Sequence, residues 1–386
     1  MKTLIISILL FFSHACIAQN VGIGTASPSA SAKVEISSTN SGFLLPRMSA
    51  SQRNAIVAPA TGLLIFNTDN NFLELWNGTA WISFGSLGVL NNGVPVGSTC
   101  NGVWSQKADI GGTARFAAAA FSIGSKGYLG IGYDNIAYKK DFWEFDPVTG
   151  AWTQKADFGG TARLAAVAFS IGSKGYIGTG YDGVAYKKDF WEYDPIGNAW
   201  TQKTDFGGVA RNGAAGFATS TNGYIGIGTD ASTDKTDFWE YDPIGNTWTQ
   251  KANFAGAGRS GGIGFCIGNA GYMGTGQSNT GAFRKDLWQY DPLLNTWTAK
   301  TDLPGVSRTG ATGFAIGSKG YISTGTNGTS RKDFWEYDSG TNAWLQKTDF
   351  AGTARNAAVN FVIGSKAYII TGNDGTIRKD FWEYCQ

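Results

Sequence analysis

The sequence predicts an all-β protein built mainly as a six-bladed β-propeller, and two observations carry this prediction. First, a tryptophan opens each copy of an internal repeat, and successive copies lie 48, 48, 48, 49 and 47 residues apart. These tryptophans are Trp104, Trp152, Trp200, Trp248, Trp297 and Trp344. Second, each copy holds four short aromatic-rich runs separated by Gly, Pro, Asn and Asp, the pattern of strands joined by turns. A repeat of this length indicates stacked units that bury a core only against their neighbours.

The second copy shows the four expected strands of one blade. They are residues 164–171, 176–180, 189–193 and 200–203. The turns between them are too tight for anything but antiparallel hairpins. Such meanders, packed radially around an axis, leave only short and protected edges.

The repeat resembles the kelch repeat over roughly three quarters of the chain. The shared features are two glycines ending the second strand, a Tyr-Asp before the third turn, a Trp six residues beyond that Asp, and an Arg before the inner strand. The resemblance implies the propeller scaffold that galactose oxidase also has. Here the glycines occur as Gly-x-Gly, and the first becomes Ser323 and Ile370 in the last two copies. The second glycine is always present, so we expect it to carry the essential backbone conformation.

The repeat register predicts how the ring closes. The array opens with a fourth strand, residues 104–107, and ends with a third strand, residues 381–384. Because kelch-like propellers with this offset complete their last blade with the N-terminal strand, we expect these two segments to pair. We therefore assign residues 100–386 to the propeller.

The N-terminal part has a different organisation. Residues 1–18 have a lysine, an apolar core and small residues at the cleavage positions, and are expected to be a cleaved signal peptide. A lipidated Cys16 is the alternative, although the three residues before it match a lipobox poorly. We expect a secreted, periplasmic or outer-surface protein without a transmembrane segment.

Residues 19–84 do not match the repeat and are expected to form a small β-rich attachment or oligomerisation module. The pieces VGIGT, GFLLPRM and LELWNGTAW resemble N-terminal modules of secreted Bacteroidetes proteins and phage tail-fibre regions. A spacer is the alternative interpretation. Residues 85–99 are expected to be a linker.

Composition excludes several kinds of chemistry. The formal net charge of +2 gives no indication of a nucleic-acid partner. The single histidine, His14, lies in the expected signal peptide, so the mature chain has no Ser-His-Asp or Cys-His system and lacks most zinc or copper sites. Since the copper site of galactose oxidase depends on histidines, only its scaffold is carried over. We expect neither a metal nor a cofactor.

Charged residues recur with the repeat on one face of the propeller. This face is formed by the loops 2–3, which join the second and third strands of a blade, and by the loops 4–1, which join a fourth strand to the first strand of the next blade. An arginine precedes the first strand of each blade: Arg115, Arg163, Arg211, Arg259, Arg308 and Arg355. An aspartate precedes each third strand: Asp141, Asp189, Asp237, Asp286, Asp333 and Asp380. These rings form either a charged mouth for a ligand or a repeated structural brace. We favour the brace, because a motif present six times is more often architecture than a site.

Loop 2–3 varies between copies, whereas loops 1–2 and 3–4 do not, and such variation on one face is typical of a binding surface. Drift in an unselected loop would give the same pattern. The predicted ligand-binding residues are Tyr138, Lys139, Lys140, Tyr186, Lys187, Lys188, Arg284 and Arg331. We expect a non-catalytic protein that binds a glycan or a protein there. The alternative is a sugar isomerase resembling the kelch-type N-acetylneuraminate epimerases, with acid–base work by Glu, Asp or Arg.

Three cysteines remain in the mature chain. Cys266 falls in an inner strand and is expected to be a buried thiol that acts as a small apolar residue. Cys100 and Cys385 align with the two sides of the missing turn of the sixth blade. Because an exported chain reaches a compartment where disulfides persist, we predict a Cys100–Cys385 disulfide.

Overall fold

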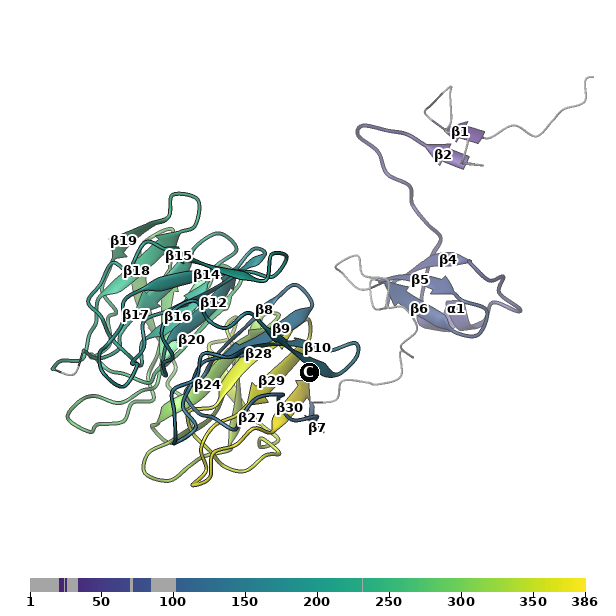
Figure 1. Cartoon of the computed structure of the whole chain (residues 1–386). Helices are drawn as coiled ribbons and strands as arrows, with labels where there is room; N and C mark the ends of the chain where they lie inside the picture. The colour runs from purple at the N-terminus through teal and green to yellow at the C-terminus, as the bar shows by residue number, and fades with distance from the viewer. Residues whose placement is uncertain (1–20, 24, 26–33, 70–71, 85–101, 231) are drawn as a thin grey trace, which may run out of the picture. The chain divides into compact units, whose positions relative to one another are not determined.

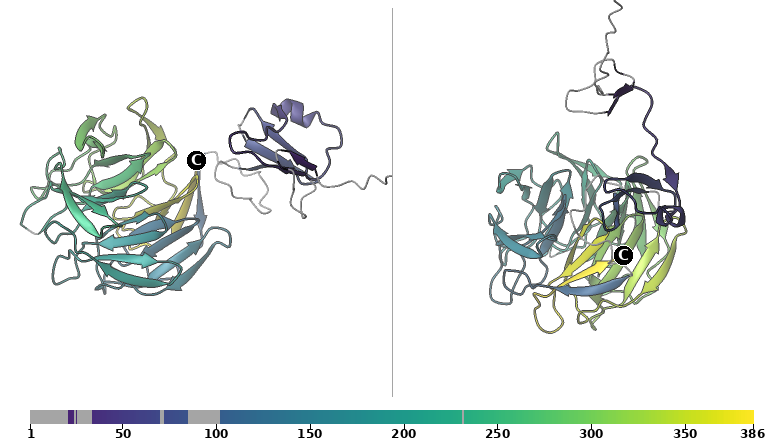
Figure 2. Two further views of the ribbon diagram at one scale, coloured as in Figure 1. Left: turned by 90° about the horizontal axis from the view of Figure 1, so that it is seen from above. Right: turned by 90° about the vertical axis from the view of Figure 1, so that its right-hand side faces the viewer.

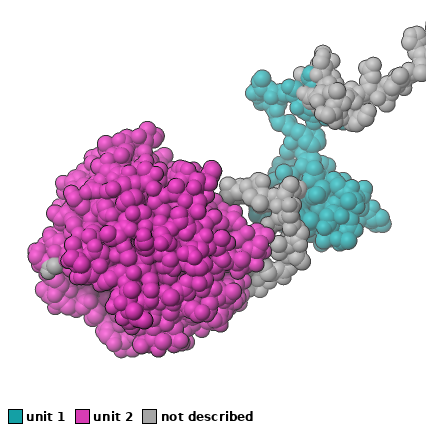
Figure 3. Space-filling model, viewed as in Figure 1, with its two compact units in different colours: residues 1–99 teal, residues 100–386 magenta. Residues whose placement is uncertain are grey.

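The computed structural model describes residues 21–23, 25, 34–69, 72–84, 102–230 and 232–386. The chain forms two compact units, Met1–Thr99 and Cys100–Gln386 (Figures 1 and 3). The expected signal peptide, the expected linker and Cys100 lie outside the described residues. No helix within the described ranges is long and apolar enough to cross a membrane.

The described residues of the first unit form two small sheets and one short helix. Strands β1 (Val21–Ile23) and β2 (Val34–Ile36) pair in parallel. The second sheet has the order β3 (Arg47–Met48), β4 (Leu64–Asn67), β5 (Phe72–Trp76) and β6 (Trp81–Phe84). Only its β3–β4 pair is parallel. Ser49 is the N-cap of helix α1 (Ala50–Asn54). Its hydroxyl accepts a hydrogen bond from Gln52 N, and the Gln52 side-chain oxygen accepts one from Ser49 N.

The second unit consists of six four-stranded antiparallel sheets, which confirms the all-β prediction. Blade 1 is β8 (Ala119–Ile123), β9 (Lys126–Gly130), β10 (Phe142–Asp146), β11 (Ala151–Lys155); blade 2 is β12 (Val167–Ile171), β13 (Lys174–Gly178), β14 (Phe190–Asp194), β15 (Ala199–Lys203). Blade 3 is β16 (Ala215–Ala218), β17 (Gly223–Gly226), β18 (Phe238–Asp242), β19 (Thr247–Lys251); blade 4 is β20 (Ile263–Ile267), β21 (Ala270–Gly274), β22 (Leu287–Asp291), β23 (Thr296–Lys300). Blade 5 is β24 (Thr309–Ile316), β25 (Lys319–Thr326), β26 (Phe334–Asp338), β27 (Ala343–Lys347); blade 6 is β28 (Val359–Ile363), β29 (Lys366–Ile370), β30 (Phe381–Cys385), β7 (Val103–Lys107).

The sheets follow one another around an axis and close into a ring. Each innermost strand contacts that of the next blade, and β28 of blade 6 contacts β8 of blade 1 (Figures 1 and 2). In blade 6, β7 pairs antiparallel with β30, Val103 standing opposite Cys385. The prediction that the N-terminal strand completes the last blade is therefore confirmed.

A circuit of backbone hydrogen bonds surrounds the axis. At the start of each blade, one residue donates its N–H to the carbonyl of its counterpart in the preceding blade, at 2.8–3.0 Å. The circuit runs through Ala117, Ala165, Gly213, Gly261, Gly310 and Ala357. All six residues have a positive φ, between 48° and 64°. Glycine adopts this left-handed backbone without strain, whereas the three alanines adopt it against their usual preference.

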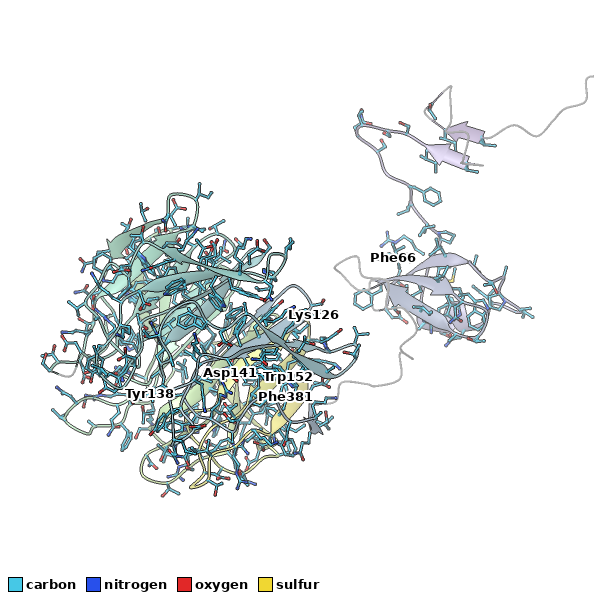
Figure 4. The ribbon with its side chains drawn as sticks, in the orientation of Figure 1. Phe66, Lys126, Tyr138, Asp141, Trp152 and Phe381 are labelled. Atoms are coloured by element: carbon cyan, nitrogen blue, oxygen red, sulfur yellow. The ribbon has the colours of Figure 1, made fainter. Side chains whose placement is uncertain are left out.

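Aromatic rings join each blade to the one before it. Trp200 of blade 2 lies edge-on to Phe142 of blade 1, with ring centroids 5.0 Å apart. Trp152 meets Phe381 of blade 6 in the same way at 5.1 Å, so the packing passes across the junction of the two chain ends (Figure 4). Because a blade cannot cover its faces alone, these aromatic contacts between blades stabilise the closed propeller.

The Gly-x-Gly segment behaves as the sequence predicts. The second glycine has φ between 92° and 108° in every blade, a region that glycine alone adopts without strain. The residue before it is also left-handed, with φ between 52° and 64°, although it is isoleucine or threonine. Left-handed β-branched residues are uncommon, so something must hold these six peptides in place.

Candidate functional site

The buried arginines hold those peptides. In blade 2, Arg163 Nη1 and Nη2 donate to the two carboxylate oxygens of Asp189 at 2.6 and 2.7 Å. Nη1 also donates to the carbonyl of the left-handed Thr179 at 3.0 Å, and the remaining two N–H groups bond to Thr161. All five guanidinium donors are thus used. The side chain of Arg163 is 0% exposed, so it offers nothing to a ligand.

Each brace also fixes the state of its carboxylate. Burial alone would raise the pKa of Asp189, but the hydrogen bonds from Arg163 outweigh burial and hold the pKa below its usual range. The indole N–H of Trp191 adds a third hydrogen bond at 2.8 Å. The same arginine–aspartate pair occurs in all six blades, an arrangement that favours a structural role.

The predicted ligand-binding residues lie in the loops 2–3. In blade 1, Tyr138 marks this end of the blade and Lys126 marks the opposite end (Figure 4). Two of the predicted lysines are paired within their own loops. Lys139 lies 2.5 Å from Asp134, and Lys187 lies 2.5 Å from Asp182. Although desolvation opposes the shift, Lys139 lowers the pKa of Asp134 to about 2.

The other predicted basic residues differ from these two. Lys140 and Lys188 are exposed, and Lys188 approaches Asp205 only at 3.8 Å. Arg331 donates to the side-chain oxygen of Asn327 at 2.8 Å. Arg284 forms no ion pair with any described residue. The predicted set therefore divides into neutralised and unpaired cations.

Five aromatic rings form a continuous row on blades 1 and 2 of this face. In order they are Phe116, Tyr133, Tyr138, Tyr181 and Tyr186, and we name them the aromatic arc. Neighbouring ring centroids are 5.9, 4.8, 6.2 and 5.1 Å apart. All five side chains are partly exposed. Burial, followed by the neighbouring tyrosines, raises the pKa of Tyr138, so its hydroxyl stays protonated at neutral pH.

In blades 3 to 6 the positions of Phe116 and Tyr133 hold amides and hydroxyls, which we name the polar arc. Its members are Asn212, Thr229, Ser260, Gln277, Thr309, Thr326, Asn356 and Asn373. They are paired across the start of each blade, as Asn212 is with Thr229 through two 3.0 Å backbone bonds. Half of them directly precede the circuit around the axis. The polar arc therefore borders the mouth of the central channel.

Sequence reasoning identified Tyr138 and Tyr186 but missed the other three rings. The missing signal was positional: Phe116 follows the brace arginine, and Tyr133 and Tyr181 follow the second glycine. Aligning those two positions over six copies would have shown aromatic residues in two blades and polar residues in four.

The channel behind the mouth is narrow. Its lining comes mainly from alanine and glycine of the inner strands, and the space next to the circuit measures about 190 Å³. Asn360 is the one amide in that lining. Cys266 lines the other end, where it is half-buried and not fully buried as expected. Burial raises its thiol pKa to about 11, which keeps it unreactive at neutral pH.

The described residues contain no cluster of His, Cys, Asp and Glu that could hold a metal ion. On this face, arginine or lysine partners lower the pKa of the carboxylates of Asp141, Asp182 and Asp230. Neither observation provides an obvious general base.

Comparison with known proteins adds two findings. Residues 22–99 match the family described as a phage tail like trimerisation region, which supports an oligomerisation role for the first unit and includes the expected linker. Among 979 matching chains of solved structures is one titled "Structure of YjhT", with a TM-score of 0.61 and 14% identity over 71% of this chain and 95% of that chain. Curated proteins give no match. The likeness to the solved structure shows the propeller fold, with which the kelch resemblance agrees.

Proposed function

We propose that the propeller is a non-catalytic module that binds carbohydrate at the mouth formed by the loops 2–3 and 4–1. The observation that carries the proposal is the division of this mouth into the aromatic arc and the polar arc. Sugar rings present C–H faces that stack on the negative faces of aromatic rings. Their hydroxyl groups need both donors and acceptors, which amides and hydroxyls supply together.

The sugar isomerase is the second candidate, since it would use the same mouth. An isomerase needs a group whose pKa lies near the working pH. Six aspartates of this mouth are instead held ionised by buried arginines, and Asp134 and Asp182 are held ionised by Lys139 and Lys187. For this reason binding is the better supported function, and a mutarotation assay on free sugars is the direct test of the alternative.

We further propose that the first unit assembles three chains. Its family match names trimerisation, and a lone two-stranded sheet is only marginally stable in water. Strands β1 and β2 nevertheless expose Val21, Ile23, Val34 and Ile36. Burying these side chains between chains would remove apolar surface from water. Three propellers on one stem would bind a repetitive glycan with gained avidity.

We also propose that the protein is exported from the cytoplasm and that a Cys100–Cys385 disulfide then forms, because disulfides persist outside the cytoplasm. Cys385 ends β30, and its carbonyl accepts from Gly102 N at 3.0 Å, which leaves Cys100 two residues along the chain. Mass spectrometry of a non-reduced digest should find the cross-linked peptide in exported protein. Free thiols at both positions would refute the bond.

Loss of a ring from the aromatic arc should weaken glycan binding. Tyr138→Ala and Tyr186→Ala are each expected to lower affinity by up to about tenfold, because a stacking contact contributes about 0.5–1.5 kcal/mol. Tyr138→Phe keeps the ring and should retain most of the affinity. The measurement is a glycan array that identifies a ligand, followed by titration of that ligand.

Val148→Ala, in an exposed turn between β10 and β11, provides the matched control on the opposite face. If the control weakens binding as much as Tyr138→Ala does, or if neither variant changes affinity, the mouth is not the binding site.

A further inference from the structure

The six loops 2–3 carry a basic residue at one equivalent position, and the blades differ in how they neutralise it. These residues are Lys139, Lys187, Lys235, Arg284, Arg331 and Arg378. Each donates its backbone N–H to the second glycine of its blade, as Arg284 N does to Gly276 O. In all but Lys235 the carbonyl also accepts from the next brace arginine, as Arg284 O does from Arg308 N. The positions are thus structurally equivalent, and any difference lies in their side chains.

In four blades an acid of the same loop neutralises this cation. The acids are Asp134, Asp182, Asp230 and Asp374, and their ion-pair distances range from 2.5 to 2.8 Å. In blades 4 and 5 the acid's place is taken by Ser278 and Asn327. These two blades are neighbours in the ring. One side of the mouth therefore carries two guanidinium groups without a carboxylate partner among the described residues.

Both groups also have unsatisfied hydrogen-bonding capacity. The Nε atoms of Arg284 and Arg331 are buried and have no hydrogen-bond partner within the described structure. A buried donor without an acceptor is unfavourable, so either guanidinium group gains by turning toward an oxyanion that enters the mouth.

A pocket of about 420 Å³ lies beside Arg284, and Arg259 and Lys285 add two further cations to its lining. The lining also includes two acids. Asp286 is already paired with Arg259, and Asp302 forms no ion pair with a described residue. Asp234 of the neighbouring blade is engaged by the backbone of Asn279 at 2.5 Å. The lining residues themselves carry three cations and two acids, an excess of one positive charge.

We infer that Arg284 and Arg331 recognise an anionic group of the ligand, so that the proposed function is the binding of a saccharide that carries a carboxylate or a sulfate. The inference rests on the proposed function for its saccharide part only. Planar guanidinium groups bind such oxyanions through paired N–H···O bonds, which an ammonium group does not offer. The aromatic arc and the polar arc then bind the sugar ring, and the arginines select its charge.

The first experiment uses inorganic sulfate on the full-length protein. Sulfate replaces chloride at constant ionic strength, and the rise in Tm is compared among the wild type, R284Q/R331Q and a control on the opposite face, K126Q/K174Q, whose lysines pair with Asp146 and Asp194 at 2.6 and 2.9 Å. General stabilisation by sulfate affects all three proteins alike, whereas site binding adds to it only where the site exists. We expect a smaller rise in R284Q/R331Q than in the other two. An equal rise in all three proteins overturns the anion site.

The second experiment separates this inference from the proposed function. On an array of neutral, carboxylated and sulfated oligosaccharides, R284Q/R331Q should lose at least about tenfold of the signal for anionic ligands, the effect of losing one good ionic contact, while K126Q/K174Q keeps it. Preference for carboxylate or sulfate identifies the anion. Binding of neutral glycans that depends on Tyr138 but not on the arginines would overturn the inference and leave the proposed function standing. Array binding that ignores Tyr138 would remove the function itself.

Discussion

Asp189→Asn should lower the free energy of unfolding by about 3–5 kcal/mol, because it leaves the guanidinium of Arg163 buried without its counter-charge. The side chain of Arg163 is 0% exposed, so solvent cannot replace the lost counter-charge. The asparagine still accepts one hydrogen bond, but it cannot accept the bidentate pair. The carbonyl of Thr179, held in a left-handed conformation by the same arginine, would lose part of its support. Denaturant unfolding of the full-length protein measures the change.

Asp205→Asn is the matched control, because Asp205 is 42% exposed and meets Lys188 only at 3.8 Å. A surface pair of this kind contributes about 0–1 kcal/mol. If the two variants unfold within about 1 kcal/mol of each other, well inside the 3–5 kcal/mol expected of a broken buried pair, the brace does not stabilise the blade.

The brace also gives the stability a dependence on pH whose sign is fixed. The six aspartates have a folded pKa below the unfolded value. Their contribution is therefore complete above the unfolded pKa of about 3.9 and is lost as pH falls through the lower folded pKa.

The sequence predicted the fold well because the repeat constrains it six times over. The tryptophan spacing, the second glycine and the offset at the two chain ends each state a geometric requirement, and each is met by φ values and strand pairs in the structure. Local turn chemistry and the alternation of aromatic residues were sufficient for these features.

The site was less accessible to sequence reasoning, because it depends on contacts between blades and within loops. The Lys139–Asp134 pair is a side-chain contact that spacing alone does not fix. The aromatic arc joins Tyr138 of blade 1 to Tyr181 of blade 2, a contact across a blade interface. Parallel pairing in the first unit was also missed, although helix α1 lies between β3 and β4 and a helical crossover is the usual connection of parallel strands.

The closure of the ring depends on Trp104 of β7, the strand that joins the chain ends. Its indole contacts Phe334 and Phe350 in blade 5 and Tyr384 in its own blade, with centroids 5.2, 5.1 and 5.1 Å away. The equivalent Trp344 contacts one ring, Tyr337, at 5.0 Å. Trp104→Ala should therefore cost about 3–5 kcal/mol of unfolding free energy, the usual price of removing a large packed aromatic residue. Trp344→Ala should cost less.

Gly102→Asn should act on the same blade in the opposite direction. In blades 2 to 5 the inner tyrosine donates to a turn asparagine at 2.7–2.9 Å, whereas the hydroxyl of Tyr384 is buried without a partner in the described residues. The equivalent turn position is Gly102, with φ 69°, and a Cβ there would meet the Tyr384 hydroxyl at an ordinary 3.4 Å. Asparagine adopts this left-handed conformation readily, so the new hydrogen bond should add about 1 kcal/mol. Tyr384→Phe should leave the free energy of unfolding nearly unchanged, while Tyr193→Phe should lower it. If both variants lower it equally, the Tyr384 hydroxyl already has a hydrogen-bond partner, and Gly102→Asn should bring no gain.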